Sequence, residues 1–150
     1  MDLAPTIRHV PDPDHPGWWT WDPPANARFA LTVGRLIVRP DGPGRGLLRM
    51  FPDESHANIA GAVHGGAILT FIDMALFAGG RAAGARLLGA VTLDLDCRFL
   101  SPGRIGTALE AEVELLKETK RLAFMRGKVA QEGQVVADFS GTLRKGNPRP

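Results

Sequence analysis

Cysteine is almost absent from this chain, since Cys97 is the only one among 150 residues. A single thiol excludes an intrachain disulfide and any metal site built from several cysteines, and it is typical of a reducing compartment. Long apolar runs are missing as well, because no uncharged stretch approaches the roughly 20 residues that a membrane-spanning helix needs. The first eight residues contain no apolar core of signal-peptide length. The sequence therefore predicts a cytoplasmic protein with no membrane partner.

Neither sign of charge dominates. The net charge is +2, and lysines and arginines are scattered rather than clustered with aromatic residues. Nucleic acid is therefore not an expected partner, whereas a small polyanionic ligand is compatible with the charge. The hydrophobic share of 44% and the charged share of 23% are ordinary for a globular protein. A chain of this length can form one domain with a sizeable core.

Regular structure is not expected in residues 1–25, because prolines remove backbone donors and disfavour helix before them. The same segment holds all three tryptophans, Trp18, Trp19 and Trp21. We expect a Pro/Trp-rich arm that packs on the body of the protein or on a partner subunit. The alternative is an arm that covers a substrate pocket. A single domain is expected over residues 26–144 and a flexible tail over 145–150.

The hydrophobic pattern predicts a short helix, one long helix and six strands. The short helix is expected over 26–32, the long helix over about 66–84, and the strands over 36–40, 46–51, 91–99, 109–115, 122–130 and 135–143. Tight turns predict that the last four strands form an antiparallel meander. Strict alternation along 91–99 predicts Thr92 on the opposite face from Leu95. The predicted class is α+β, with one long buried central helix wrapped by a curved antiparallel sheet of five to six strands.

Residues 58–73 form the most informative segment. From Ala67 to Ala78 the only polar side chains are Thr70 and Asp73. A helix that is apolar all round is normally buried, and a carboxylate on it is costly unless it is paired or functional. Two glycines at the helix start leave backbone N–H groups open to a ligand's oxygen. A carbonyl-binding turn and a buried acid in one segment predict chemistry on a carbonyl group.

This segment resembles the hotdog-fold acyl-CoA thioesterases of the 4-hydroxybenzoyl-CoA thioesterase-like superfamily. It is most similar to the branch associated with phenylacetic-acid degradation. Asn58 lies six residues before His64, and Asp73 lies seven residues after Gly66. The resemblance covers roughly residues 33–144 and leaves the tryptophan arm outside. Its other matching segments are Val91–Asp94, Phe99–Gly103 and Leu122–Phe124.

The resemblance implies hydrolysis of an acyl-CoA or aryl-CoA thioester, without cofactor or metal, by a homodimer that often pairs into a homotetramer. It implies Asp73 as general base or nucleophile and the Gly65 N–H as the group that stabilises the oxyanion. Asn58 is expected to orient water or bind the carbonyl, or simply to form the loop. His64 is a base by residue type, but the family pattern favours a structural role. Thr92 matches a position beside the acid.

Two other functions stay open. One is a non-catalytic acyl-CoA-binding hotdog module. The other is a hotdog dehydratase or hydratase, although such enzymes use a catalytic histidine with a differently placed acid, a pattern that is missing here.

Helix geometry adds a prediction about assembly. Gly65 and Asp73 lie eight residues apart, and therefore about 12 Å apart along a helix axis. One chain cannot easily bring both to the same carbonyl, whereas two antiparallel helices related by a two-fold axis can. We therefore expect an active site shared between two chains.

Overall fold

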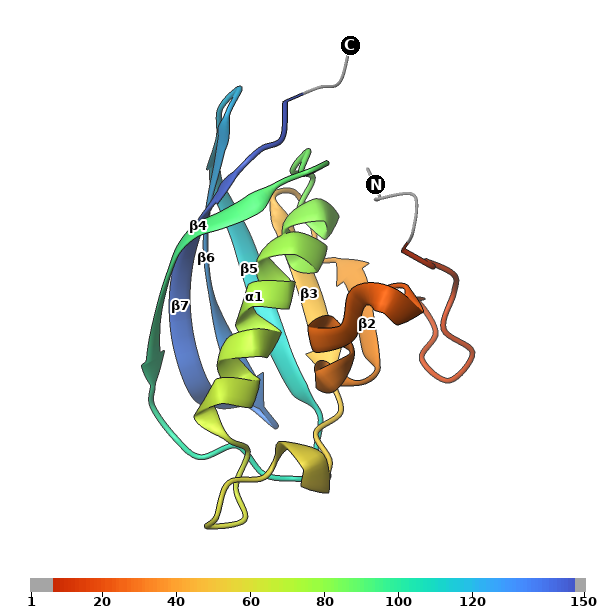
Figure 1. Cartoon of the computed structure of the whole chain (residues 1–150), viewed down its shortest axis with the longest axis vertical. Coiled ribbons are helices and arrows are strands. Elements are labelled where there is room, and N and C mark those ends of the chain that lie inside the picture. Colours follow the sequence, from red (N-terminus) through yellow and green to blue (C-terminus); the bar gives the residue numbers. More distant parts are fainter. Residues whose placement is uncertain (1–6, 148–150) are drawn as a thin grey trace.

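One long helix lies across the concave face of a seven-stranded antiparallel sheet (Figure 1). The computed structural model describes residues 7–147. The helix α1 spans Gly65–Ala82, and two 3-10 helices, η1 and η2, span Ala25–Val33 and Glu54–His56. The strands are β1 Trp19–Thr20, β2 Leu36–Pro40, β3 Arg45–Met50, β4 Val91–Phe99, β5 Leu109–Glu118, β6 Leu122–Gln131 and β7 Gln134–Arg144. None of the helices in this part of the chain is long and apolar enough to cross a membrane.

The core lies between α1 and the sheet. Phe71, Ile72 and Leu76 of the helix are fully buried against it. The helix comes so close to β3 that a Cβ on Gly46 would lie 2.2 Å from the carbonyl oxygen of Gly79. Only glycine at position 46 permits this approach, so the two glycines determine where the helix crosses the sheet. The predicted α+β arrangement of a central helix and a curved antiparallel sheet is confirmed.

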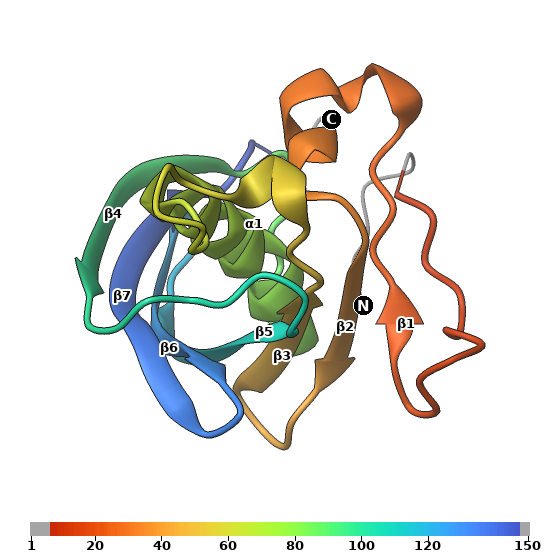
Figure 2. The same cartoon turned by 90° about the horizontal axis from the view of Figure 1, so that it is seen from below.

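The predicted meander of the last four strands is wrong at β4. The strand order is β1-β2-β3-β5-β6-β7-β4, so β4 pairs with β7 and lies at the edge of the sheet. The connection over residues 100–108 is not a tight turn. It carries the chain from β4 past the start of the helix to β5, on the other side of β6 and β7 (Figure 2). The last three strands do form the predicted antiparallel meander.

The sheet has seven strands rather than five to six because the tryptophan arm adds β1. Trp19 and Thr20 pair antiparallel with β2, in a segment predicted to be irregular. Trp18 packs on Ile37 and Leu47, on the face of the sheet opposite α1. Trp21 is buried in the main core. The described part of the arm is therefore packed on the body of the protein, and residues 1–6 lie outside the description.

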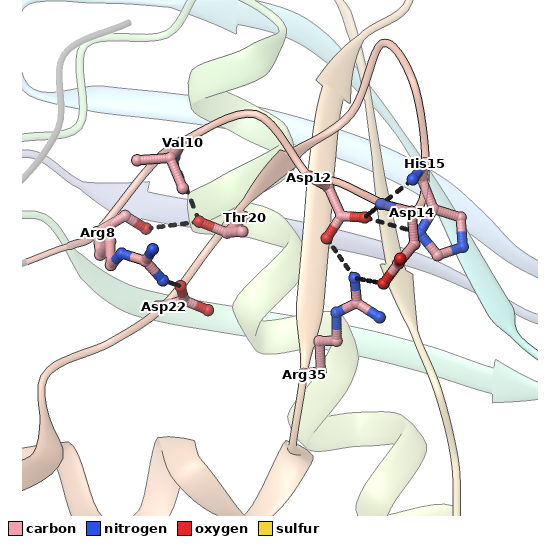
Figure 3. Close-up of polar contacts among 8 residues, drawn as sticks. All are labelled: Arg8, Val10, Asp12, Asp14, His15, Thr20, Asp22 and Arg35. Atoms are coloured by element: carbon pink, nitrogen blue, oxygen red, sulfur yellow. Dashed lines mark hydrogen bonds and ion pairs between the residues drawn. The ribbon is translucent and has the colours of Figure 1, made fainter.

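Asp12 anchors the arm. Its carboxylate is buried and accepts hydrogen bonds from the His15 ring Nδ1 at 2.9 Å and from the backbone N–H groups of Asp14 and His15 (Figure 3). It also pairs with the Arg35 guanidinium just before β2. Burial raises the pKa of Asp12, but the hydrogen bonds from His15 and Arg35 outweigh it and hold the pKa at about 2. The arm is thus fastened by a carboxylate that stays ionised in mild acid.

Two further predictions concern segments at the chain's flanks. The helix expected over 26–32 is present as η1, but it is a 3-10 segment with non-helical dihedrals at Arg28 (φ 37°, ψ −82°). In the tail expected to be flexible over 145–150, Lys145 donates to Glu118 and to the Thr119 carbonyl. Residues 148–150 lie outside the description.

Candidate active site

The start of α1 leaves one backbone donor without a partner in the described part of the chain. His64 is the N-cap, and its ring Nδ1 accepts the N–H of Gly66 at 2.8 Å. The N–H groups of Ala67 and Ile68 donate to the His64 carbonyl. The N–H of Gly65 has no acceptor among residues 7–147. A ligand oxygen can therefore bind this N–H at the positive end of the helix dipole.

His64 consequently has a structural role at the helix start. Its Nδ1 accepts a hydrogen bond from the backbone, so a neutral ring carries its own proton on Nε2. Its backbone N–H donates to the His56 carbonyl at 2.7 Å, which fixes the residue immediately before Gly65. This geometry favours the structural interpretation of His64 over a role as base.

Asp73 lies two turns further along α1 and is partly buried rather than fully enclosed. The Thr92 hydroxyl donates to its Oδ1 at 2.8 Å. Asp73 has no cationic partner within the described chain, so no ion pair there offsets the charge of its carboxylate. Such a carboxylate keeps free lone pairs for a proton or a carbonyl carbon.

A β-bulge brings Thr92 to the helix. The pairing of β4 with β7 shifts between Thr92 and Asp94, so one extra residue, Leu93, interrupts the alternation. Thr92 therefore faces Asp73, while Leu95 beyond the bulge also packs towards the core. The strict alternation predicted from the sequence, with Thr92 opposite Leu95, is wrong for this reason.

Asn58 builds the loop that precedes the helix. Its side-chain oxygen accepts the N–H groups of Ala60 at 2.9 Å and Ala62 at 3.1 Å. Its backbone N–H donates to the Ala62 carbonyl at 2.7 Å. These bonds match the loop-forming interpretation of Asn58. They leave the amide nitrogen with no partner among the described residues.

Two neighbouring cavities lie along this side of the helix. The first, of about 350 Å³, is lined by residues that include His64, Gly66 and the buried His56. The second, of about 420 Å³, is lined by Asp73, by Thr70 and by apolar side chains. The helix start and the carboxylate thus face different cavities of the same chain. None of the three tryptophans lines either cavity as the structure describes them.

Sequence reasoning missed three residues here. Phe29 of η1 lines both cavities. The ring of Phe99 covers the helix start, since a Cβ on Gly65 would lie 3.4 Å from it. His56 had no recognisable partner in the sequence, yet its Nε2 bonds to the Thr32 carbonyl at 2.7 Å. No local pattern marks these residues, because their contacts come from segments far apart in the chain.

Comparison with known proteins decides which family this arrangement represents. The sequence profile described as "Thioesterase superfamily" matches residues 60–137, which include the helix start, Asp73 and Thr92. The chain belongs to the thioesterase superfamily. It is therefore a thioester hydrolase by family, as the resemblance predicted.

Individual members of the thioesterase superfamily align over most of the chain. Mouse acyl-coenzyme A thioesterase 13 is 30% identical over 125 residues, which cover 79% of this chain and 86% of the relative. A solved mutant structure of the phenylacetic acid degradation protein PaaI from Thermus thermophilus is 27% identical. It covers 79% of this chain and 98% of its own, with a TM-score of 0.66. A protein from Streptococcus pneumoniae described as a hypothetical thioesterase, solved with coenzyme A, has a TM-score of 0.70 over 83% of this chain and 98% of its own. At 18% identity it shows the shared fold alone.

Proposed function

We propose that this protein hydrolyses acyl-CoA thioesters to a free acid and CoA. The observation that carries the proposal is the Gly65 N–H, which has no acceptor within residues 7–147, on a helix that also carries Asp73. The family to which the chain belongs and the relatives named acyl-coenzyme A thioesterase 13 in mouse and human support it. The apolar cavity beside Asp73 is compatible with an acyl or an aryl group.

In this proposal the Gly65 N–H binds the thioester carbonyl oxygen. Attack on the carbonyl carbon places negative charge on that oxygen, and a positioned N–H at a helix start stabilises the charge. Because Gly65 has no side chain, the thioester can approach the backbone closely. The amide nitrogen of Asn58, in the loop before the helix, can hold water or the same carbonyl.

Asp73 supplies the attack by one of two routes. As a general base it takes a proton from water, whose oxygen bonds to the carbonyl carbon, and the tetrahedral intermediate then breaks its C–S bond to release the thiol of CoA. As a nucleophile its own oxygen bonds to the carbonyl carbon, CoA leaves, and water hydrolyses the resulting anhydride. In both routes Thr92 is a positioning residue, because its hydroxyl holds one carboxylate oxygen at 2.8 Å.

Two chains are needed to assemble this site. The carbonyl donor and the attacking group must both lie within about 3–3.5 Å of the reacting atoms. Gly65 and Asp73 are about 12 Å apart along one helix, and His64 and Gly66 line a different cavity from Asp73. We propose a two-fold dimer in which the helix start of one chain lies near Asp73 of the other.

The surface offers an interface for such a dimer. β4 is an edge strand of nine residues that pairs on one side only. Val91 and Leu93 on it are 47% and 54% exposed, and Leu69 on the neighbouring part of α1 is 41% exposed. The helix predicted to be buried all round is therefore only partly covered in one chain. A second copy would cover these apolar groups, and two such dimers would form the expected homotetramer.

Release of free thiol from acyl-CoA tests the function. Purified wild-type protein and Asp73→Asn are assayed with short, long and aromatic acyl-CoAs and a colorimetric thiol reagent. We expect turnover by the wild type and a loss of about 10²–10⁴-fold in kcat for Asp73→Asn, with unchanged folding by circular dichroism. A variant with wild-type kcat would remove Asp73 from the mechanism.

The same assay distinguishes hydrolysis from the two alternative functions, a non-catalytic acyl-CoA-binding module and a dehydratase or hydratase. Tight binding of acyl-CoA without thiol release from any substrate in the panel would favour a binding module. Loss of the double-bond absorbance of an enoyl-CoA without thiol release would favour a hydratase. Either result would overturn the proposed hydrolysis.

A further inference from the structure

The 3-10 segment η1 packs against α1 (Figure 1). Residues of η1 line both cavities. Phe29 in its middle lines both of them, and the only other residue that does so is Thr70 of the helix, within the described chain. Phe29 therefore lies, with Thr70, on the boundary between the cavity at the helix start and the cavity at Asp73. Although it lines both cavities, Phe29 is 70% exposed.

The backbone around Phe29 is held in an unusual conformation. Arg28, the residue before it, has a positive φ of 37°, which is strained for a side chain with a Cβ. The Thr32 hydroxyl donates to the Phe29 carbonyl at 2.6 Å, and the His56 Nε2 donates to the Thr32 carbonyl at 2.7 Å. The backbone that carries the Phe29 side chain is thus held by contacts from Thr32 and His56.

The same contacts connect Phe29 to the helix start. His56 is buried, its Nδ1 accepts the Asp53 N–H at 3.0 Å, and its backbone carbonyl accepts the His64 N–H at 2.7 Å. His64 in turn caps α1 next to Gly65. Buried His56 therefore connects the backbone of η1, through the Thr32 carbonyl, to the residue that precedes Gly65.

We propose that Phe29 determines which acyl groups the site accepts, by closing the apolar cavity beside Asp73 on the side of η1. This proposal rests on the proposed acyl-CoA hydrolysis. Asp73 is the only charged residue among those that line this cavity in the described chain, and its apolar walls include Leu69, Met74 and Leu95. The cavity therefore suits an unbranched apolar chain or an aromatic ring that ends against Phe29. The other cavity, of about 350 Å³, lies on the far side of the ring.

A smaller and a larger side chain at position 29 should shift substrate preference in opposite directions. Phe29→Ala joins the two cavities, so long acyl chains gain room while acyl groups that end at the ring lose a contact. Phe29→Trp places a larger ring in the cavity wall, which leaves less room for long acyl chains. One extra or missing methylene of a substrate in an apolar pocket changes kcat/KM by about 10–200-fold. We expect the ratio of kcat/KM for a 16-carbon over an 8-carbon acyl-CoA to rise at least about tenfold in Phe29→Ala and to fall in Phe29→Trp.

Leu31→Ala is the matched control. Leu31 belongs to the same segment, is also an exposed apolar residue at 43%, and lines neither cavity as described. All four proteins are assayed for kcat and KM across unbranched chains of 4 to 16 carbons and phenylacetyl-CoA. Because Phe29 is largely exposed, its variants should fold, and melting temperatures within a few degrees of the wild type check this.

The outcomes distinguish the two proposals. A changed ranking in both Phe29 variants, with the wild-type ranking in Leu31→Ala, supports Phe29 as the specificity residue. An active wild type whose ranking is unchanged in both Phe29 variants overturns this inference and leaves the hydrolysis intact. A ranking altered equally by Leu31→Ala also overturns it, because the effect would then belong to the segment as a whole. A wild type that releases no thiol from any substrate overturns the proposed function itself.

Discussion

Two groups on one helix carry the chemistry proposed for this protein, the N–H of Gly65 and the carboxylate of Asp73. Both follow from residue identity. A glycine at the first helical position leaves its N–H accessible, and His64 satisfies the next N–H and not this one. A carboxylate held by a single hydroxyl, from Thr92, keeps lone pairs for catalysis. Each group can be removed by a single substitution outside the buried core.

Gly65→Pro removes the proposed oxyanion donor. Proline is well tolerated at the first helical position, where its missing N–H breaks no helix bond. His64 already has the extended dihedrals (φ −61°, ψ 135°) that a residue before proline requires. We expect kcat to fall by about 10²–10³-fold with the helix intact by circular dichroism.

Gly65→Ala is the control for this change. It keeps the N–H and adds a Cβ at 3.4 Å from the Phe99 ring, as proline also does. Because the Cβ also narrows the approach of the thioester to the backbone, alanine should lose some activity, but much less than proline, which lacks the donor. Equal losses in the two variants would assign the effect to crowding against Phe99 and not to the donor.

At the scale of elements, the arm and its anchor lie away from Gly65 and Asp73, and Trp21 of the arm contacts α1 near its end, where the Arg81 guanidinium lies over the Trp21 ring. Trp18 packs on the face of the sheet opposite α1, and β1 extends the edge at β2, far from β4 (Figure 2). Asp12 and Arg35 fasten this arm to the start of β2. The arm should therefore contribute to stability without affecting the choice of substrate.

Acid should release the arm through Asp12. Its pKa is lowered from 3.8 to about 2 in the folded chain, so its stabilising contribution is complete above the unfolded value and is lost as pH falls towards the folded value. We expect the difference in melting temperature between wild type and Asp12→Asn to be constant from neutral pH to about pH 5 and to shrink towards pH 2. All three tryptophans lie in the arm, so their fluorescence reports its release.

Asp14→Asn serves as the reference for that titration. Asp14 also approaches Arg35, at 3.4 Å, but its side chain is 69% exposed. An exposed pair of this kind contributes little to stability, so its substitution should leave the melting temperature nearly unchanged. A wild-type advantage over Asp12→Asn that grows on acidification would contradict the proposed anchor.

The local sequence pattern predicted most helices and strands, and it was wrong where strands far apart in the sequence pair with each other. The alternation in β5 and the apolar helix from Gly65 are encoded by neighbouring residues, and both are confirmed. The position of β4 next to β7 depends on a crossover that no local signal describes. The bulge at Thr92 has the same origin, because it arises in the pairing with Leu143 and Thr142. Phe29 could not be predicted, since its role depends on cavities that exist only in the folded chain.

At the scale of the whole molecule, one chain supplies half of each proposed active site. Asp73 and the residues around Gly65 face different cavities, β4 presents an unpaired edge, and apolar groups such as Leu93 are exposed. A two-fold partner would cover these groups and bring a helix start to each Asp73. Activity should therefore require the dimer, and each dimer should contain two equivalent sites.

Complementation between two inactive variants tests this most directly. Asp73→Asn and Gly65→Pro are each inactive alone, and they are mixed in equal amounts under conditions in which labelled subunits are shown to exchange. In a mixed dimer one site combines an intact Gly65 with an intact Asp73, and the other site carries both changes. Random exchange should then restore about a quarter of the wild-type thiol release per chain, since half of the dimers are mixed and each has one working site. No recovery despite proven exchange, or full activity in a proven wild-type monomer, would show that a single chain builds the site.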